Sequence, residues 1–202
     1  GWPLYVSWDF GLGDATALIW WQRNPKTGLF RIIDCYTNAG PTIDFYAPLC
    51  TGQLPSGLPY LYSDGDLVKV EAHRGWPPAV HFGDPAGEQR NQVTGTSVVA
   101  ELRKANIHVQ SRPDVNNFEA RWQRTKLFLR RIEGVNVPAC NVLDDAIANA
   151  RFPEHREGSQ ATSEITKPIH DWTSDLRTAV EYMAVNISEA EREPRAAKRR
   201  HS

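Results

Sequence analysis

The chain has 202 residues, of which 41% are hydrophobic, with 23 Lys and Arg against 24 Asp and Glu. This length and apolar content are enough for one ordinary globular core, and the seven Trp, seven Phe and six Tyr exclude a disordered chain. The net charge of −1 indicates no particular partner, and there is neither an apolar run near the roughly 20 residues of a membrane-spanning helix nor a signal-peptide pattern. The three widely spaced cysteines, Cys35, Cys50 and Cys140, are typical of reduced, buried thiols in an intracellular protein rather than of a disulfide framework or a zinc site.

The charges are unevenly distributed along the chain. The segment from Arg103 to Arg131 has eight basic residues against two acidic ones, a net charge of +6, so the remainder carries −7. A basic region facing a cluster of acids suits a metal-dependent enzyme that acts on a polyanion. Runs of charge are usually solvated helix faces, and that alternative stays open here.

Hydrophobic periodicity and turn residues predict the elements of the chain. Residues 4–9 alternate in polarity with a period of two, which predicts a strand ending at Asp9, and Gly11 and Gly13 allow a tight reversal after it. The remaining expected elements are, in order, strands over residues 17–21 and 29–36, a long loop rich in Pro and Gly over residues 40–59, a helix over residues 63–74, a strand over residues 79–84, a helix over residues 96–105, a strand over residues 107–109, and helices over residues 116–131, 140–150 and 171–187.

This order predicts an α/β fold with a mixed sheet. Antiparallel first strands followed by parallel strands of βαβ units give such a sheet, with helices on both faces. We expect one domain over residues 1–187, cut from a longer polypeptide, and a charged tail over residues 188–202. Asp9 ends the first strand, Asp84 ends the fourth and Asp175 comes from the last helix, so the three carboxylates could converge where open α/β sheets place their sites.

Three segments carry a more specific signal: Ser7–Thr16 (SWDFGLGDAT), His81–Gly87 (HFGDPAG) and His170–Tyr182 (HDWTSDLRTAVEY). Together and in this order they resemble the C-terminal nuclease domain of the large terminase subunit of tailed bacteriophages, within the RNase H-like superfamily. The resemblance extends over nearly the whole chain. The chain has no Gly-x-x-x-x-Gly-Lys-Ser/Thr motif, so the packaging ATPase of that family is not expected in it.

The resemblance implies an endodeoxyribonuclease that cuts concatemeric double-stranded DNA with little sequence specificity by two-metal hydrolysis. Two Mg²⁺ or Mn²⁺ ions on carboxylate ligands would activate the water and stabilise the leaving oxygen. The family's acids carry over to Asp9, expected to bridge both ions, and to Asp84, expected to bind one. For the third acid, Asp175 fits an Asp-Leu-x-x-Ala pattern, Thr178 falls where another family pattern has Asp, and Asp171 is a reserve that also suits a helix N-cap. We choose Asp175.

The resemblance also implies auxiliary residues. His170 lies five residues before Asp175, where RNase H-like enzymes often place a His that assists proton transfer or product release, and an ordinary helix-entry residue is the equal alternative. Basic residues that could contact phosphates, and so make DNA binding salt-dependent, are Arg121, Arg124, Lys126 and Arg130. A solvated helix face is the alternative for each of them.

Partners and location follow from the same resemblance. It implies an N-terminal packaging ATPase domain in the full-length protein, a small terminase subunit and a portal as partners, no membrane, and the cytoplasm of an infected bacterial host. Two other interpretations stay open. A resolvase- or transposase-like enzyme would use the same acids on branched or specific DNA, and a non-catalytic DNA-binding or docking module would carry them only as structural groups.

Overall fold

The structure of the chain is a computed structural model that describes residues 1–11, 15–39, 43–51, 76, 79–90, 95–112, 117–151 and 168–190. The strands are β1 (Leu4–Asp9), β2 (Ala15–Arg23), β3 (Phe30–Ala39), β4 (Val80–Gly83), β5 (Val109–Gln110) and β6 (Ile132–Val135). The helices are α1 (Ile43–Thr51), α2 (Val98–Lys104), α3 (Phe118–Leu129), α4 (Val137–Asn149), α5 (Ser174–Ala190) and the 3₁₀ turn η1 (Pro85–Glu88).

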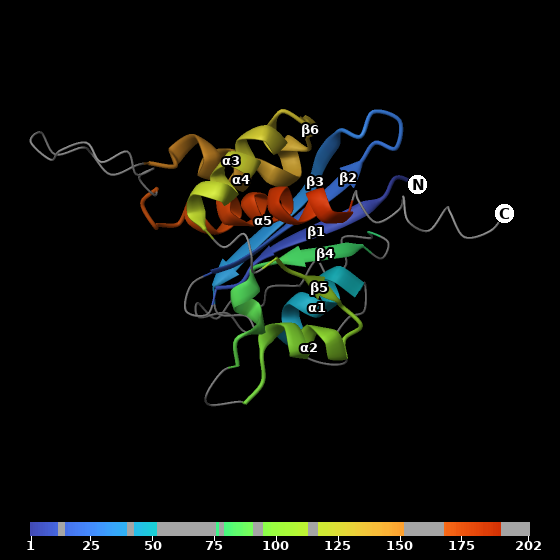
Figure 1. Cartoon of the computed structure of the whole chain (residues 1–202), viewed down its shortest axis with the longest axis vertical. Helices are drawn as coiled ribbons and strands as arrows, with labels where there is room; N and C mark the ends of the chain where they lie inside the picture. Colours follow the sequence, from blue (N-terminus) through green and yellow to red (C-terminus); the bar gives the residue numbers. More distant parts are fainter. Residues whose placement is uncertain are drawn as a thin grey trace, which may run out of the picture.

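The described strands form a six-stranded sheet with the order β5-β4-β1-β2-β3-β6 (Figure 1). β1, β2 and β3 are antiparallel neighbours, which short connections can join. β4 runs parallel to β1, β5 runs parallel to β4, and β6 runs parallel to β3. The prediction of a mixed α/β sheet with antiparallel first strands is therefore confirmed.

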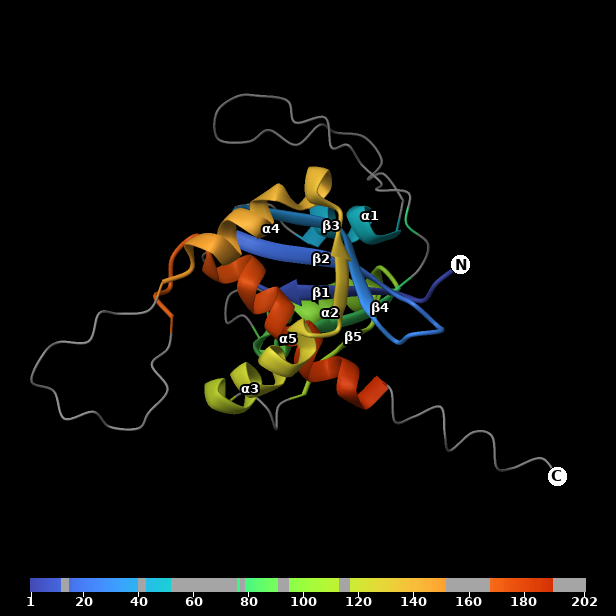
Figure 2. The same cartoon turned by 90° about the horizontal axis from the view of Figure 1, so that it is seen from above.

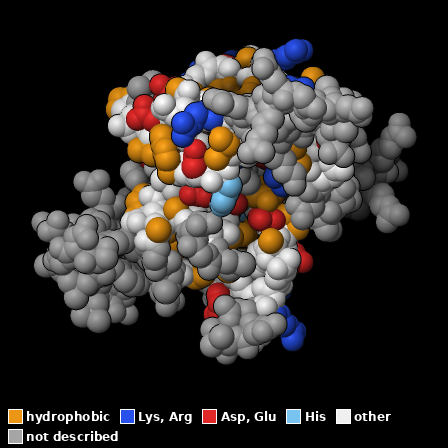
Figure 3. Space-filling model, turned by 90° about the vertical axis from the view of Figure 1, so that its left-hand side faces the viewer, with side chains coloured by type: hydrophobic (Ala, Val, Ile, Leu, Met, Phe, Trp, Pro, Cys, Tyr) orange, Lys and Arg blue, Asp and Glu red, His pale blue; other side chains and the backbone are white. Residues whose placement is uncertain are grey.

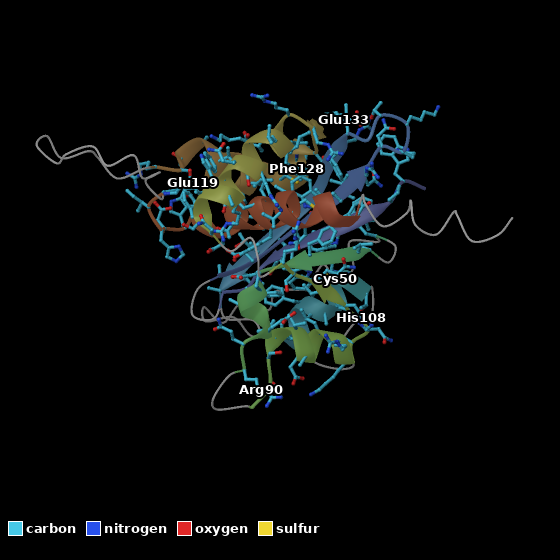
Figure 4. All side chains as sticks on the ribbon, in the orientation of Figure 1. Cys50, Arg90, His108, Glu119, Phe128 and Glu133 are labelled. Atoms are coloured by element: carbon cyan, nitrogen blue, oxygen red, sulfur yellow. The ribbon has the colours of Figure 1, made fainter. Side chains whose placement is uncertain are left out.

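Helices cover both faces of the sheet. α3, α4 and α5 form one layer, with α5 between the other two (Figure 2), and α1 and α2 cover the opposite face. Because side chains alternate along a strand, β1 contributes to both cores: Tyr5 packs in the layer of α5, and Trp8 packs in the layer of α1 and α2. Figure 4 shows Phe128 in the first layer and Cys50 in the second.

Two elements differ from the sequence predictions. α1 occupies part of the expected long loop, because tertiary contacts stabilise it: Tyr46 is buried, its ring meets that of Trp8 edge-on with centroids 6.5 Å apart, and its hydroxyl donates to the Asn38 carbonyl at 2.7 Å. The sequence does not predict β6. This strand lies at the edge of the sheet and is only four residues long, and its Gly134 weakens the strand pattern. The predicted helix over residues 63–74 lies outside the described residues.

Other expectations have mixed outcomes. Cys35, Cys50 and Cys140 are all buried, and none of the three forms a disulfide bond, as the sequence predicts. Trp172, which helical spacing assigns to the apolar face of the last helix, is 58% exposed, because α5 begins only at Ser174. No helix in the described part of the chain is long and apolar enough to cross a membrane.

A tight aromatic contact joins the ends of β1 and β4. The ring of Phe10, directly after β1, lies against Gly83 and Gly87. A Cβ atom on Gly83 would come within 2.8 Å of Phe10 Cε2, and one on Gly87 within 2.6 Å of Phe10 Cδ2. Both contacts are closer than a side chain tolerates, so the two glycines are required by space rather than by backbone conformation. This joint positions the segment that carries Asp84.

We predict that Gly87→Ala lowers the free energy of unfolding by about 1–3 kcal/mol, the usual cost of overpacking a core. Urea denaturation followed by tryptophan fluorescence measures the change. Gly134→Ala is the matched control, because nothing lies within 4 Å of a Cβ added there. If the two variants were equally stable, the claim that the Phe10 ring leaves no space for a side chain at Gly87 would be wrong.

His81 is a buried hydrogen-bond acceptor on β4. Its Nδ1 atom accepts from Trp8 Nε1 at 3.1 Å, and the residue is 7% exposed. Burial lowers the pKa of His81 from 6.5 to about 4, because a charged imidazole would be poorly solvated there. The folded protein therefore favours the neutral form of the His81 ring.

We predict that His81 makes the fold acid-sensitive. Since the unfolded chain binds a proton at this residue below about pH 6.5 and the folded chain does so only near pH 4, stability is complete above pH 6.5 and falls by about 3 kcal/mol towards pH 4. His81→Asn, whose amide oxygen can replace Nδ1 as acceptor, should remove this component from the pH dependence of the melting temperature. His108→Asn, at an exposed position, should leave it unchanged.

Candidate functional site

Asp9 and Asp84 lie side by side at one edge of the sheet. β1 and β4 are adjacent and parallel, with Trp8 paired to Gly83, so the next residue on each strand is one of the two acids. Neighbouring strands lie about 4.8 Å apart, and residues in register point to the same face. The register therefore brings both carboxylates to the face that α5 covers. Figure 3 looks at this edge of the sheet, where acidic side chains gather around a histidine.

The turn after β4 orients Asp84. Its side chain caps η1 and accepts a hydrogen bond from the Ala86 N–H at 2.8 Å, while Pro85 opens the turn. Tyr182 on α5 lies near the same carboxylate: burial raises the pKa of that tyrosine, and the negative charge of Asp84 raises it further. The turn after β4 thus fixes the orientation of Asp84.

Asp175 brings a third carboxylate to the same edge. It lies in the first turn of α5, which packs against β1, β2 and β4, and it is 9% exposed. Burial raises the pKa of Asp9 well above its ordinary value, and the negative charges of Asp175 and Asp84 raise it further; the Arg121 guanidinium acts in the opposite direction. Two acids far apart in the sequence therefore act electrostatically on Asp9.

The three acids suit a hard divalent cation. In the described part of the chain, no three His, Cys, Asp or Glu side chains already converge as a metal-binding group. Asp84 and Asp175 are close enough to Asp9 to repel its negative charge, and Asp84 meanwhile accepts from the Ala86 N–H. A set of carboxylate oxygens is nevertheless what Mg²⁺ and Mn²⁺ prefer, and a cation would relieve the negative charge around Asp9.

The alternatives for the third acid occupy different places. Asp171 is engaged at the entry to α5, where its Oδ1 accepts from the Thr173 N–H at 2.9 Å and the Thr173 hydroxyl at 2.6 Å. These bonds lower the pKa of Asp171. Thr178 is half-buried on α5, one turn after Asp175, and His170 is exposed just before the helix.

The four basic candidates on or beside α3 are not equivalent. Lys126 and Arg130 are exposed, and Arg124 is half-buried. Arg121 points inward instead: its side chain is 15% exposed, and its Nε donates to Glu181 Oε2 at 2.6 Å.

Sequence reasoning missed three residues of the site, all on α5: Arg177, Glu181 and Tyr182. Glu181 is fully buried between Arg121 and Arg177, and its charge also acts on Asp9. Tyr182 lies near Asp84, and its ring packs against the Arg121 guanidinium. The sequence carries one signal for Glu181, its i, i+4 spacing from Arg177, which suits an ion pair along a helix.

The strand order and the helices on both faces define an RNase H-like α/β fold. No protein-family model matches the chain, and no curated protein does. Similarity is found among solved structures, where the predicted resemblance to terminase nuclease domains is confirmed at the level of the fold.

Three structures illustrate this likeness. The nuclease domain of the bacteriophage SPP1 large terminase, with bound Mn, matches with a TM-score of 0.57 and 11% identity, over 89% of this chain and 84% of that one. The nuclease domain of the P22 large terminase matches with a TM-score of 0.56 and 16% identity, over 90% and 79%. The large terminase of a thermophilic bacteriophage matches with a TM-score of 0.59 and 16% identity, over 92% of this chain and 39% of that one.

We predict that Asp9→Asn stabilises the metal-free protein at neutral pH, because it removes a buried charge that Asp84 and Asp175 repel. The melting temperature in EDTA should rise by about 2–4 °C for each kcal/mol of repulsion removed. A raised pKa means that the penalty is absent at low pH and grows as the pH rises, so the two proteins should converge near pH 4. Asp145→Asn, at an exposed acid of α4, is the control; a less stable Asp9→Asn protein would contradict the prediction.

Proposed function

We propose that the chain is the metal-dependent endonuclease domain of a viral genome-packaging terminase, which cuts concatemeric double-stranded DNA with little sequence specificity. The observation that carries the proposal is the register of β1 and β4, which brings Asp9 and Asp84 together beside Asp175. The fold shared with terminase nuclease domains supports it. A cluster of carboxylates on a fold of this class suits metal-assisted hydrolysis of a phosphodiester.

The acids would hold two divalent cations, Mg²⁺ or Mn²⁺, as the Mn bound to the SPP1 nuclease domain suggests. When bound, such ions supply an activated water and stabilise the leaving oxygen of a phosphodiester. Asp9, central in the sheet edge, is proposed to bridge both ions, Asp84 to bind one and Asp175 the other. Asp84 would keep its orientation through the Ala86 N–H. His170, exposed at the entry to α5, is proposed to accept or return a proton near the leaving group.

The basic helix α3 is proposed to face the DNA backbone. Arg124, Lys126 and Arg130 lie on or just after α3, which packs beside the helix that carries Asp175. Contacts of arginine and lysine with phosphates position a duplex without reading its sequence, and they weaken as salt rises. This arrangement supports cutting with little sequence preference.

The wider context is also proposed. Because the chain spans about two fifths of the length of the thermophilic-bacteriophage large terminases that it matches, the full-length protein would include an N-terminal packaging ATPase domain. The small terminase subunit and the portal would be its partners in the cytoplasm of an infected bacterium. The domain itself is proposed to cover residues 1–187, followed by a tail over residues 188–202.

The proposal is tested by cleavage of linear plasmid DNA in Mn²⁺. We predict that Asp9→Asn, Asp84→Asn and Asp175→Asn each reduce the cleavage rate at least about a hundredfold, since each removes a charge that would hold a catalytic cation. Asp144→Asn, an exposed acid of α4, serves as the control and should cut like the wild type. If all three variants cut DNA like the wild type, the catalytic assignment is wrong and a DNA-binding or docking module is the better interpretation. If the wild type cuts only branched DNA, a resolvase-like enzyme is the better interpretation.

The third ligand is tested separately. Asp175→Ala, Asp171→Ala and Thr178→Ala are compared by calorimetric titration with Mn²⁺. Loss of one binding event in Asp175→Ala alone is expected, because of these three residues only Asp175 acts electrostatically on Asp9. If Asp171→Ala or Thr178→Ala loses the binding event instead, the residue replaced in that variant is the third metal ligand.

A further inference from the structure

A buried cluster of three charges lies between α3 and α5. The Glu181 side chain is fully buried and accepts from Arg121 Nε at 2.6 Å and from Arg177 Nη1 at 2.9 Å, while each arginine side chain is 15% exposed. Two guanidinium groups share one carboxylate, so the cluster carries a net charge of +1. A buried excess charge is costly unless an opposite charge lies nearby.

That opposite charge is the acid site. The Arg121 guanidinium lies 5.3 Å from the centroid of the Tyr182 ring. Tyr182 follows Asp175 by seven residues, which is two helical turns, so both lie on the same face of α5. Arg121 therefore lies against the face of α5 that carries the third acid, and its positive charge also lowers the pKa of Asp9.

We propose that Arg121 is the resident counter-charge of the acid site, a positioning residue that Glu181 fixes in place and that offsets the repulsion among Asp9, Asp84 and Asp175 in the metal-free protein. The inference rests on the proposed function, because it takes the three acids to be the metal site. The positive charge of Arg121 has two opposite effects. It stabilises the metal-free protein, because it offsets the repulsion among the acids, and it weakens metal binding, because it repels a divalent cation.

This role differs from the phosphate contact expected from the sequence. The Arg121 side chain is largely enclosed and its Nε is engaged with Glu181, whereas Lys126 and Arg130 are exposed. The two roles predict opposite behaviour. Loss of a phosphate contact weakens DNA binding, whereas loss of a counter-charge strengthens metal binding.

The test compares Arg121→Met with Arg121→Lys. Met keeps most of the aliphatic stem of Arg without its charge, and Glu181 stays paired with Arg177, so no buried carboxylate is left alone. Calorimetric titration of each full chain with MnCl₂ should show about three- to tenfold tighter binding for Arg121→Met, because a unit positive charge close to the cation is gone. Arg121→Lys, which keeps the charge, should bind like the wild type. Arg103→Met, which removes an exposed charge of α2, is the control and should not change the affinity.

Stability supplies a second measurement. In EDTA, Arg121→Met should melt below Arg121→Lys, and saturating MnCl₂ should close most of that difference. If Arg121→Met does not fold, Arg121→Gln replaces it, because Gln is also uncharged and Glu181 stays paired with Arg177. It should likewise bind Mn²⁺ more tightly than the wild type.

Equal or weaker Mn²⁺ binding by the uncharged variant would overturn the inference and leave Arg121 a structural residue. Reduced binding of linear duplex DNA in EDTA, with a smaller salt dependence and unchanged Mn²⁺ affinity, would overturn it in favour of a phosphate contact. Failure of the proposed function is distinguishable, because the wild-type chain would then neither bind Mn²⁺ nor cut DNA.

Discussion

Electrostatic repulsion among carboxylates at one edge of the sheet is the constraint on which this structure depends. Parallel pairing of β1 and β4 brings Asp9 and Asp84 to the same edge, and α5 adds Asp175. Water screens such charges poorly once they are partly buried. The surroundings compensate with the Ala86 N–H, which donates to Asp84, and with the positive charge of the Arg121 guanidinium near Asp9. Under the proposed function this unfavourable arrangement would serve metal binding, because a cation would relieve the repulsion that acts on Asp9.

The rest of the fold holds the edge of the sheet rigid. Two aromatic-rich cores sandwich the sheet, with Trp8 in one and Tyr5 in the other, so β1 cannot move without disturbing both. The Phe10 ring, packed on Gly83 and Gly87, fixes the end of β1 to the turn after β4. Asp9 and Asp84 are therefore brought together by the packing of the residues beside them, because their own negative charges repel each other.

The success of sequence prediction differed from element to element for physical reasons. β1 alternates in polarity, β2 contains a continuous run of apolar residues, and α5 has an apolar face with helical spacing, all local properties that the chain displays directly. α1 and β6 depend on non-local contacts: Tyr46 of α1 packs on Trp8, and β6 exists only because β3 offers an open edge. Local composition argues against both elements.

The same division applies to the site. By themselves the residues identified the strand ends that carry Asp9 and Asp84 and the helix that carries Asp175, because polarity periods and turn residues mark where each element ends. Whether a charged side chain faces solvent or the interior is decided by the packing partner of its helix, and no local pattern contains that partner. Only the tertiary structure therefore separated inward-facing Arg121 from exposed Lys126 and Arg130 on one basic segment, and only it showed that Glu181 and Tyr182 belong beside the acids.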